Sequence, residues 1–277
     1  MASFSASIRP RALITGASSG IGAAFAQRLA REGHDLVLLA RRRNRLEELA
    51  ERLRLDPGVQ VEVFCADLTD AEELAKVEAT IAGDGIMDLL VNNAGFGGYQ
   101  PFASLEPRTV DDLIDIHVRA VTRLTRAVLP GMIGRGKGGI INISSLLALS
   151  GPLPPNPLPY RATYAAAKAY MLAFTQAIAG ELNGTGVGVQ VCLPGRVSTE
   201  FHTSQGIDIS KWPAMMTADD IVRASLAALA RREVVCIPAL ADAALFDRIS
   251  EAQIAVLRGA ALQPMLAARY GSLSSRA

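Results

Sequence analysis

The sequence is poor in the side chains that build disulfide frameworks and metal centres. The three cysteines are odd in number, far apart and embedded in apolar runs: Cys65, Cys192 and Cys236. The three histidines are equally dispersed, with no metal-ligand spacing: His34, His117 and His202. This distribution predicts reduced, buried thiols and no metal site.

Long apolar segments and an excess of one charge are also lacking. No apolar run approaches the roughly 20 residues that cross a bilayer, and residues 1–11 lack the apolar segment of a secretory signal. The 28 Lys and Arg residues balance 27 Asp and Glu residues, and the one short basic run is residues 41–43. We therefore expect a cytoplasmic protein without a transmembrane segment, whose partner is a small molecule and not a nucleic acid.

What is present is a regular alternation of apolar strand-like runs with helix-length segments. The composition, 50% hydrophobic and 20% charged, is typical of a globular α/β protein with a sizeable core. The strand-like runs are residues 12–15, 36–40, 59–65, 89–92, 139–144, 187–193 and 234–237. Continuous apolar strands that alternate with helices predict a parallel sheet covered on both faces, in one domain over residues 1–277.

Two segments interrupt this alternation, and both leave strand ends. Residues 150–159 hold five prolines, which exclude a helix or an inner strand. Residues 200–213 form a mixed stretch before a helix opened by Thr217. Because ligands bind beyond the carboxyl ends of strands in open α/β sheets, we expect substrate loops near 146–160 and 200–216.

The first strand-like run leads into a glycine-rich segment, residues 15–22 (TGASSGIG). Gly16 permits a tight turn, Gly20 lets the backbone approach a pyrophosphate, and the following helix, from about residue 21, supplies oriented N–H groups. The alternative is an ordinary turn between a strand and a helix. The context favours a dinucleotide site.

Tyr164 and Lys168 are spaced as surface neighbours on one helix. Bringing a phenol from a pKa of about 10 to about 7 takes about 4 kcal/mol, and one positive charge at about 4 Å supplies that much at an effective dielectric of about 20. The spacing therefore predicts an acid/base pair. Tyr160 has no lysine four residues on and is a weaker candidate, while a surface role for Lys168 is the alternative.

Taken together, the motifs TGASSGIG (15–22), NNAG (92–95), the serine pair 144–145, residues 164–168 and the Pro-Gly pair 194–195 resemble those of the short-chain dehydrogenase/reductase family, in its compact single-domain branch. They fall in that family's order over residues 11 to about 200. The resemblance implies a Rossmann-like doubly wound sheet of about seven parallel strands, NAD(P) binding and carbonyl/alcohol interconversion. It also implies a homodimer or homotetramer.

The resemblance carries specific residues over to this chain. It implies a catalytic set of Ser145, Tyr164 and Lys168, with Ser144 as a strand-end hydroxyl that satisfies backbone. The residues implied to bind the cofactor are Gly16, Ser18, Ser19, Gly20, Ile21, Gly22, Arg41, Arg42, Asp67, Leu68, Asn93, Ala94, Gly95, Tyr164, Lys168, Pro194, Gly195, Val197 and Thr199.

Cofactor choice is addressed by the residues after the second strand. In place of an acidic residue for a ribose hydroxyl, the chain has Arg41 and Arg42, whose natural partner is a 2′-phosphate. We therefore expect NADP(H) to be preferred over NAD(H), the alternative being a solvated helix start. The resemblance puts Asp67 and Leu68 at the adenine, whereas the structural alternative for Asp67 is to cap the helix from about residue 70.

His117 departs from the family pattern, which has an asparagine there whose backbone carbonyl holds a water beside the active-site lysine. His117 preserves that relay through its own carbonyl, and its imidazole is a candidate participant because histidine titrates near neutral pH. Simple helix packing is an equal alternative.

These observations predict an NADP(H)-dependent oxidoreductase that interconverts a carbonyl and a secondary alcohol. The apolar loop segments favour a hydrophobic substrate. One alternative is a non-catalytic NADP-binding redox sensor, and another is an epimerase or dehydratase of nucleotide sugars. The tail 239–277 is expected to be helical, with apolar faces that pack beside the substrate loop or in a homo-oligomer interface. A membrane-surface helix is the alternative, which its weak net positive charge disfavours.

Overall fold

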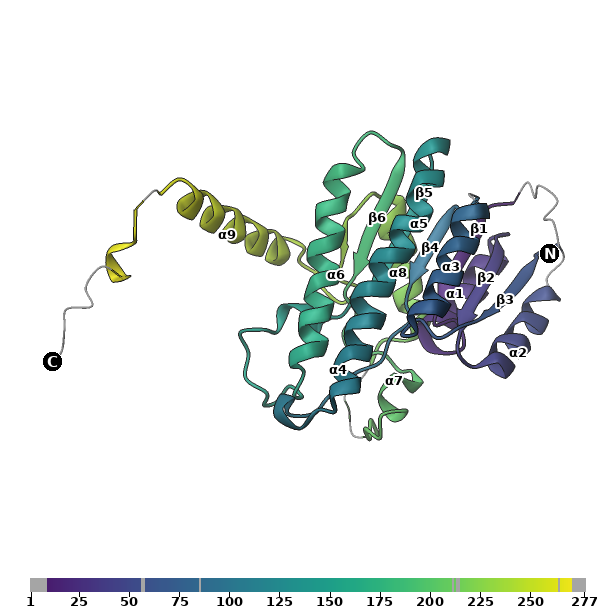
Figure 1. Ribbon diagram of the computed structural model, residues 1–277, viewed down its shortest axis with the longest axis horizontal. Coiled ribbons are helices and arrows are strands. Elements are labelled where there is room, and N and C mark those ends of the chain that lie inside the picture. The colour runs from purple at the N-terminus through teal and green to yellow at the C-terminus, as the bar shows by residue number, and fades with distance from the viewer. Residues whose placement is uncertain are drawn as a thin grey trace. The chain divides into compact units, whose positions relative to one another are not determined.

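The computed structural model describes residues 9–55, 58–84, 86–210, 212, 215–263 and 265–270 (Figure 1). They form one parallel sheet in the order β3-β2-β1-β4-β5-β6-β7. The strands are β1 Arg11–Thr15, β2 Asp35–Ala40, β3 Val61–Cys65, β4 Leu89–Asn92, β5 Gly138–Ile143, β6 Val187–Cys192 and β7 Val235–Cys236. The expected doubly wound sheet of seven parallel strands is confirmed.

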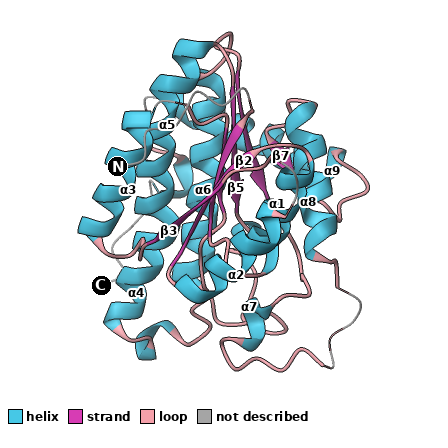
Figure 2. Cartoon of the chain, turned by 90° about the vertical axis from the view of Figure 1, so that its right-hand side faces the viewer, coloured by secondary structure: helices cyan, strands magenta, loops and turns pink. Residues whose placement is uncertain are grey.

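Helices cover both faces of the sheet, which Figure 2 shows nearly edge-on. The helices of residues 1–238 are α1 Gly20–Arg31, α2 Arg43–Arg54, α3 Ala71–Asp84, α4 Pro107–Ile114, α5 Ala120–Arg135, α6 Ala162–Glu181, α7 Glu200–Thr203 and α8 Ala218–Ala230. Between α4 and α5 the chain forms a π-helical turn, η2, at Asp115–Arg119. The short 3-10 turns η1 and η3 lie at Phe102–Ser104 and Leu146–Leu149.

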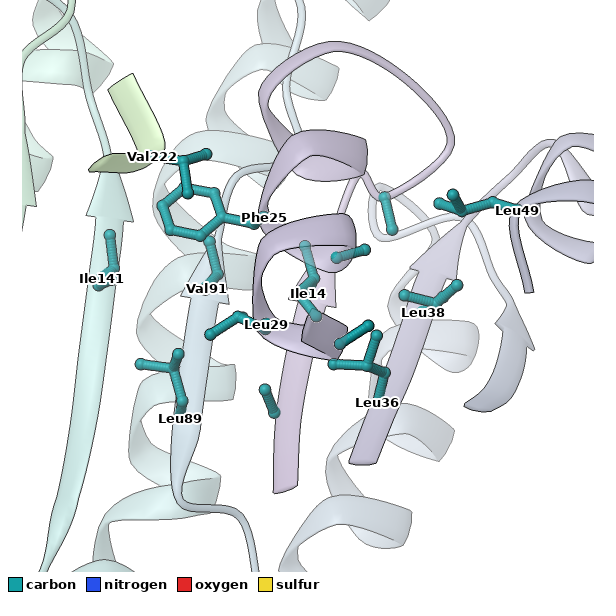
Figure 3. Close-up of a cluster of buried hydrophobic side chains, with 14 of the residues drawn as sticks. Ile14, Phe25, Leu29, Leu36, Leu38, Leu49, Leu89, Val91, Ile141 and Val222 are labelled. Carbon is teal, nitrogen blue, oxygen red and sulfur yellow. The ribbon is translucent and has the colours of Figure 1, made fainter. Parts of the chain in front are cut away.

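Alternate residues of the strands supply two separate cores. On one face, Ile14, Leu38 and Val91 pack with Phe25 of α1 and Val222 of α8 (Figure 3). The other face packs against α3, α5 and α6 through a second set: Leu13, Val37, Leu90, Ile140, Leu74, Leu124 and Ile178. Because strands buried on both faces need apolar residues at every position, their near-continuous hydrophobicity in the sequence is explained.

Local sequence determines where several elements begin and end. Thr217 caps α8, since its hydroxyl accepts a hydrogen bond from the Asp220 amide at 3.1 Å while the Asp220 carboxylate accepts one from the Thr217 amide at 3.0 Å. The proline-rich segment 150–159 contains no helix or strand, as expected. The expected loop at 200–213 instead begins with the short helix α7, which Thr199 caps.

A buried polar network fixes α6 against the centre of the sheet. The Asn92 side chain donates to Asn142 at 2.9 Å and to Thr125 at 3.2 Å, and Asn142 donates to Thr175 of α6 at 2.9 Å. Thr175 in turn donates to the carbonyl of Met171. The network therefore links β4, β5, α5 and α6 in one alignment.

The chain divides into two compact units, Met1–Pro238 and Ala239–Ala277. The second contains α9 at Ala244–Ala261 and a 3-10 turn, η4, at Ala268–Tyr270. Within the described residues, no helix is both long and apolar enough to cross a membrane. The three cysteines are free, and Cys192 and Cys236 are buried as expected, whereas Cys65 is partly exposed.

Candidate active site

A cavity of about 1000 Å³ opens at the carboxyl ends of the central strands. It lies where the chain order of the sheet reverses between β1 and β4, the usual ligand position in such sheets. It brings together these residues selected from the sequence: Gly16, Ser18, Ser19, Gly20, Ile21, Arg41, Arg42, Asp67, Leu68, Asn93, Ala94, Gly95, His117, Ser145, Tyr164, Lys168, Pro194, Gly195, Val197 and Thr199.

The glycine turn between β1 and α1 leaves its backbone open to a ligand. Gly16 and Gly20 have φ angles of +67° and +55°, in the region that disfavours other residues. A Cβ atom on Gly16 would lie 2.8 Å from the Cα of Ala94. Gly22 does not line the cavity. It packs inside the turn, where a Cβ would meet the Gly16 carbonyl and the Asn93 side chain. Its role is therefore packing of the turn.

The end of β4 is tied to this turn by hydrogen bonds. The Thr15 hydroxyl accepts from the amides of Asn93 and Ala94, both at 2.9 Å, and the Asn93 side chain donates to the Thr15 carbonyl at 2.9 Å. Gly95 faces the imidazole of His117 so closely that no Cβ fits there. These contacts place 93–95 on the cavity wall.

Arginines surround the far end of the glycine turn. Arg42 donates to the hydroxyls of Ser18 at 2.8 Å and Ser19 at 2.7 Å. Arg41 donates to the Asp67 carboxylate at 3.3 Å. Glycines that admit a pyrophosphate, a helix N-terminus and these guanidinium groups fit a phosphorylated dinucleotide.

Asp67 is held by its own loop and does not cap α3. Its carboxylate accepts from the Thr69 amide at 3.0 Å and the Thr69 hydroxyl at 2.8 Å, while Asp70 accepts from the first amides of α3. Partial burial raises the pKa of Asp67, but the hydrogen bonds from Thr69 and the charge of Arg41 leave it lowered. Asp67 is thus a charged acceptor on the cavity wall beside the buried Leu68.

The catalytic candidates lie together at the other end of the cavity. Tyr164 and Lys168 of α6 are each only 4% exposed, and the Lys168 ammonium lies 5.6 Å from the centre of the Tyr164 ring. Lys168 donates to the Ile143 carbonyl at 2.8 Å. Ser145, the second residue after β5, lines the same cavity as Tyr164. Tyr160 is 51% exposed and does not line the cavity.

Ser144 has the backbone role expected of it. Its hydroxyl donates to the carbonyl of Lys168 at 2.8 Å. This bond joins the end of β5 to the middle of α6, so that Ser145 is presented to the same space as Tyr164.

The electrostatics of the pair differ from the expectation. Burial raises the pKa of Tyr164 well above its ordinary value, the charge and hydrogen bond of Tyr99 raise it further, and the hydrogen bond with Ser145 lowers it. Burial lowers the pKa of Lys168 to about 7. Desolvation disfavours the charged form of both groups, and it outweighs the Coulomb attraction that their spacing predicts. The protein alone therefore keeps the proton on Tyr164.

Sequence reasoning missed Tyr99, which follows β4. Its ring packs edge-on against Tyr164 with centres 5.5 Å apart, and burial raises its pKa to about 12. A Cβ on Gly97 would lie 2.7 Å from the Tyr99 ring. The available signal was the glycine pair before this tyrosine.

An aromatic wall continues from Tyr99 into the segment after β6. The His202 ring stacks on Tyr99 at 6.4 Å and meets Trp212 edge-on at 4.6 Å, while Phe201 lies 6.2 Å from Tyr164. We refer to Tyr99, Phe201, His202 and Trp212 as the aromatic wall.

His117 is 1% exposed and lies in the π-helical turn η2. Its Nε2 is 2.9 Å from the Phe96 carbonyl, and its ring is perpendicular to that of Tyr164 at 5.5 Å. Burial, with the charge of Lys168, lowers the pKa of His117 well below its ordinary value. The imidazole is therefore neutral near pH 7, and its Nε2–H donates to Phe96. Within the part of the chain that the structure describes, Nδ1 has no partner.

Comparison with known proteins identifies the family. Residues 10–209 match the family model described as short chain dehydrogenase. The chain therefore belongs to the short-chain dehydrogenase/reductase family and is an oxidoreductase that acts on CH–OH groups.

Three relatives illustrate the range of this similarity. A structure described as a short-chain dehydrogenase from Sphingobium yanoikuyae in complex with NADPH is 40% identical, with a TM-score of 0.87 over 94% of this chain and 100% of that chain. The bulky-bulky ketone specific alcohol dehydrogenase from Comamonas testosteroni is 36% identical, with a TM-score of 0.85 over 95% and 99%. The 17-beta-hydroxysteroid dehydrogenase type 3 of Danio rerio is 32% identical over 80% of this chain and 71% of that protein.

Other curated relatives are longer than this chain. The chain spans 60–63% of the very-long-chain 3-oxoacyl-CoA reductases of four vertebrates.

Proposed function

We propose that this protein is an NADP(H)-dependent oxidoreductase that interconverts a carbonyl and a secondary alcohol on a hydrophobic small molecule. The observation that carries the proposal is the shared cavity, which joins the glycine turn and its arginines to Ser145, Tyr164 and Lys168. A hydride-transfer enzyme requires a cofactor site and an acid/base group that open into the same cavity.

Each catalytic side chain has a distinct task in carbonyl reduction. Bound NADPH supplies the hydride that adds to the carbonyl carbon. Tyr164 gives its hydroxyl proton to the carbonyl oxygen, and Ser145 donates a hydrogen bond to the same oxygen, which orients the substrate. Because burial raises the pKa of Tyr164, the protein holds this residue in the form that reduction needs. In alcohol oxidation Tyr164 accepts the proton.

Lys168 is a positioning and electrostatic residue in this scheme. Its ammonium is fixed by the Ile143 carbonyl close to the Tyr164 ring, and in its charged form it favours proton loss from Tyr164 during oxidation. The neutral His117 packs against the same ring. We assign the nicotinamide end of the cofactor to the wall that contains Lys168 and the segment 194–199.

The preference for NADP(H) over NAD(H) rests on Arg41 and Arg42. Both line the cavity beyond β2, where a carboxylate would be needed to bind a ribose hydroxyl. The Sphingobium relative, described as a complex with NADPH, supports this preference.

The substrate class is proposed from the wall near Tyr164. Around Tyr164 the cavity is lined by the aromatic wall and by the aliphatic residues Leu146, Leu147 and Leu158, which favour an apolar ketone. The relative specific for bulky-bulky ketones supports a substrate with two large substituents. We further propose a cytoplasmic homodimer or homotetramer, as the family resemblance implies.

A ketone panel assayed with NADPH and with NADH tests this function. The wild-type protein is expected to reduce apolar ketones faster with NADPH. Tyr164→Phe should lose about 10²- to 10⁴-fold in turnover, the usual contribution of a general acid, whereas the matched Tyr160→Phe should lose far less. Full activity of Tyr164→Phe, or reversed effects of the two variants, would overturn the assignment of the acid.

A further inference from the structure

One carboxylate lies among the arginines of the proposed 2′-phosphate site. Glu200 accepts a hydrogen bond from Arg45 at 2.5 Å and from Arg42 at 3.4 Å. It is the first residue of α7, after β6, and meets these arginines across more than 150 positions of sequence. The hydrogen bond and charge of Arg45, with the charge of Arg42, hold the pKa of Glu200 below its ordinary value. Glu200 is thus ionised at neutral pH.

Each of the three guanidinium nitrogens of Arg42 has a hydrogen-bond partner. Its Nε and Nη2 atoms donate to the hydroxyl of Ser18, its Nη2 also donates to Ser19, and its Nη1 faces Glu200. A phosphate binds arginine most strongly through paired N–H groups. A phosphate on Arg42 would therefore lie beside a carboxylate of the same charge sign, so the two anions repel one another and compete for the same N–H groups.

Glu200 also belongs to the segment that forms the substrate wall. Its neighbour Thr199 lines the cavity and caps α7 by accepting from the Phe201 amide at 3.3 Å. Phe201 lies against Tyr164, and His202 lies against Trp212. Glu200, which contacts the arginines, is therefore the immediate sequence neighbour of Phe201, which contacts Tyr164.

We propose that Glu200 is a specificity-determining residue that competes with the adenosine 2′-phosphate of NADP(H) for Arg42 and Arg45. Binding of that phosphate releases Glu200 and repositions α7, which couples cofactor choice to the aromatic wall. The inference rests on the proposed NADP(H)-dependent function, and it assigns to the substrate segment a role at the opposite end of the cofactor.

Binding of adenosine 2′,5′-bisphosphate, with adenosine 5′-monophosphate as the probe that lacks the 2′-phosphate, tests the competition by calorimetry. Glu200→Gln should bind the bisphosphate about 1.5- to 5-fold more tightly than wild type, the range expected for half-exposed ion pairs. Its affinity for the monophosphate should not change. Because salt screens exposed charges, the gain should shrink as ionic strength rises.

Glu47→Gln is the matched control. Glu47 pairs with Arg43 at 3.4 Å and is 50% exposed, close to the 53% of Glu200, yet it pairs with neither Arg42 nor Arg45. Both variants remove one negative charge from the same region. Glu47→Gln should therefore bind both nucleotides as the wild type does, and equal gains in the two variants would refute a specific competition.

Trp212 reports the coupling, since it is the one tryptophan of the sequence and lies against His202. The bisphosphate should change its fluorescence in the wild type, the monophosphate should not, and Glu200→Gln should show a reduced change. If the Trp212 emission stayed unchanged although the bisphosphate bound, the coupling would be overturned. A wild type that binds both nucleotides equally would contradict the NADP(H) preference, whereas unchanged bisphosphate affinity in Glu200→Gln would refute the competition itself.

Discussion

Replacing Lys168 by methionine should stabilise the protein at pH 6 while abolishing its proposed activity. Lys168 is 4% exposed, and burial lowers its pKa from 10.5 to about 7. Methionine has a similar length and is unbranched, so it fills the same space without a charge. The substitution therefore isolates the cost of holding an ammonium in the interior.

The size of the effect follows from linkage between protonation and folding. The difference between 10.5 and about 7 corresponds to about 5 kcal/mol at 1.36 kcal/mol per pKa unit. Since the unfolded chain binds this proton more tightly, the penalty is complete below pH 7 and disappears as the pH rises to 10.5. Methionine leaves the Ile143 carbonyl without its donor, which costs about 1–3 kcal/mol. The net gain at pH 6 is about 2–4 kcal/mol.

The difference in the free energy of unfolding between Lys168→Met and wild type can be measured by urea unfolding without added nucleotide, from pH 6 to pH 10.5. Lys168→Met should be more stable than wild type at pH 6, and the difference should shrink and change sign toward pH 10.5, where only the lost hydrogen bond remains. Lys76→Met, at an exposed lysine, is the control and should show no such trend. A Lys168→Met protein that is less stable than wild type by the same amount at every pH would refute the reasoning.

Three further predictions follow from the site and the tail. Arg41→Asp combined with Arg42→Ser should weaken NADPH binding about tenfold or more for each lost charge-assisted contact and relatively favour NADH, as measured by titration of both cofactors; tighter binding of NADH by the wild type would contradict the proposed preference. His117→Asn should leave the neutral-range pH profile of turnover unchanged, since the lowered pKa keeps His117 neutral there; with a deuterated-cofactor isotope effect showing that chemistry limits the rate, loss of a titration step near pH 6.5 would instead place the imidazole in proton delivery. Truncation before Ala239 should change the mass in light scattering or expose apolar surface to a dye, and unchanged mass, dye binding and activity would show the tail to be dispensable.

The fold was largely predictable because each buried strand is a local apolar run. The runs at 89–92 and 36–40 coincide with β4 and nearly with β2. By contrast, β7 has only two residues where a run of four was expected, since only Val235 and Cys236 pair with β6. The π-helical turn around His117 has no distinct local signal, since π turns depend on tertiary contacts.

The motif residues of the site were predictable, but their partners were not. Spacing within one helix placed Tyr164 beside Lys168, because helical geometry is fixed. The contact of Glu200 with Arg42 forms because the segments after β2 and β6 both lie at the carboxyl end of the sheet. The two residues are far apart in the sequence, and no local pattern predicts that they meet. The pKa of Tyr164 depends on how deeply α6 is buried, which a pairwise charge argument does not contain.

The buried network of Asn92, Asn142, Thr125 and Thr175 sets the alignment of α6 from a position away from the cavity. Each of these four side chains makes at least one hydrogen bond in the network, so a slip of α6 by one residue would leave buried polar groups unpaired, at about 1–3 kcal/mol each. Apolar side chains at these positions would tolerate such a slip. The distance between Ser145, at the end of a strand, and Tyr164, on a helix, is thus held by amide and hydroxyl groups that never meet the substrate.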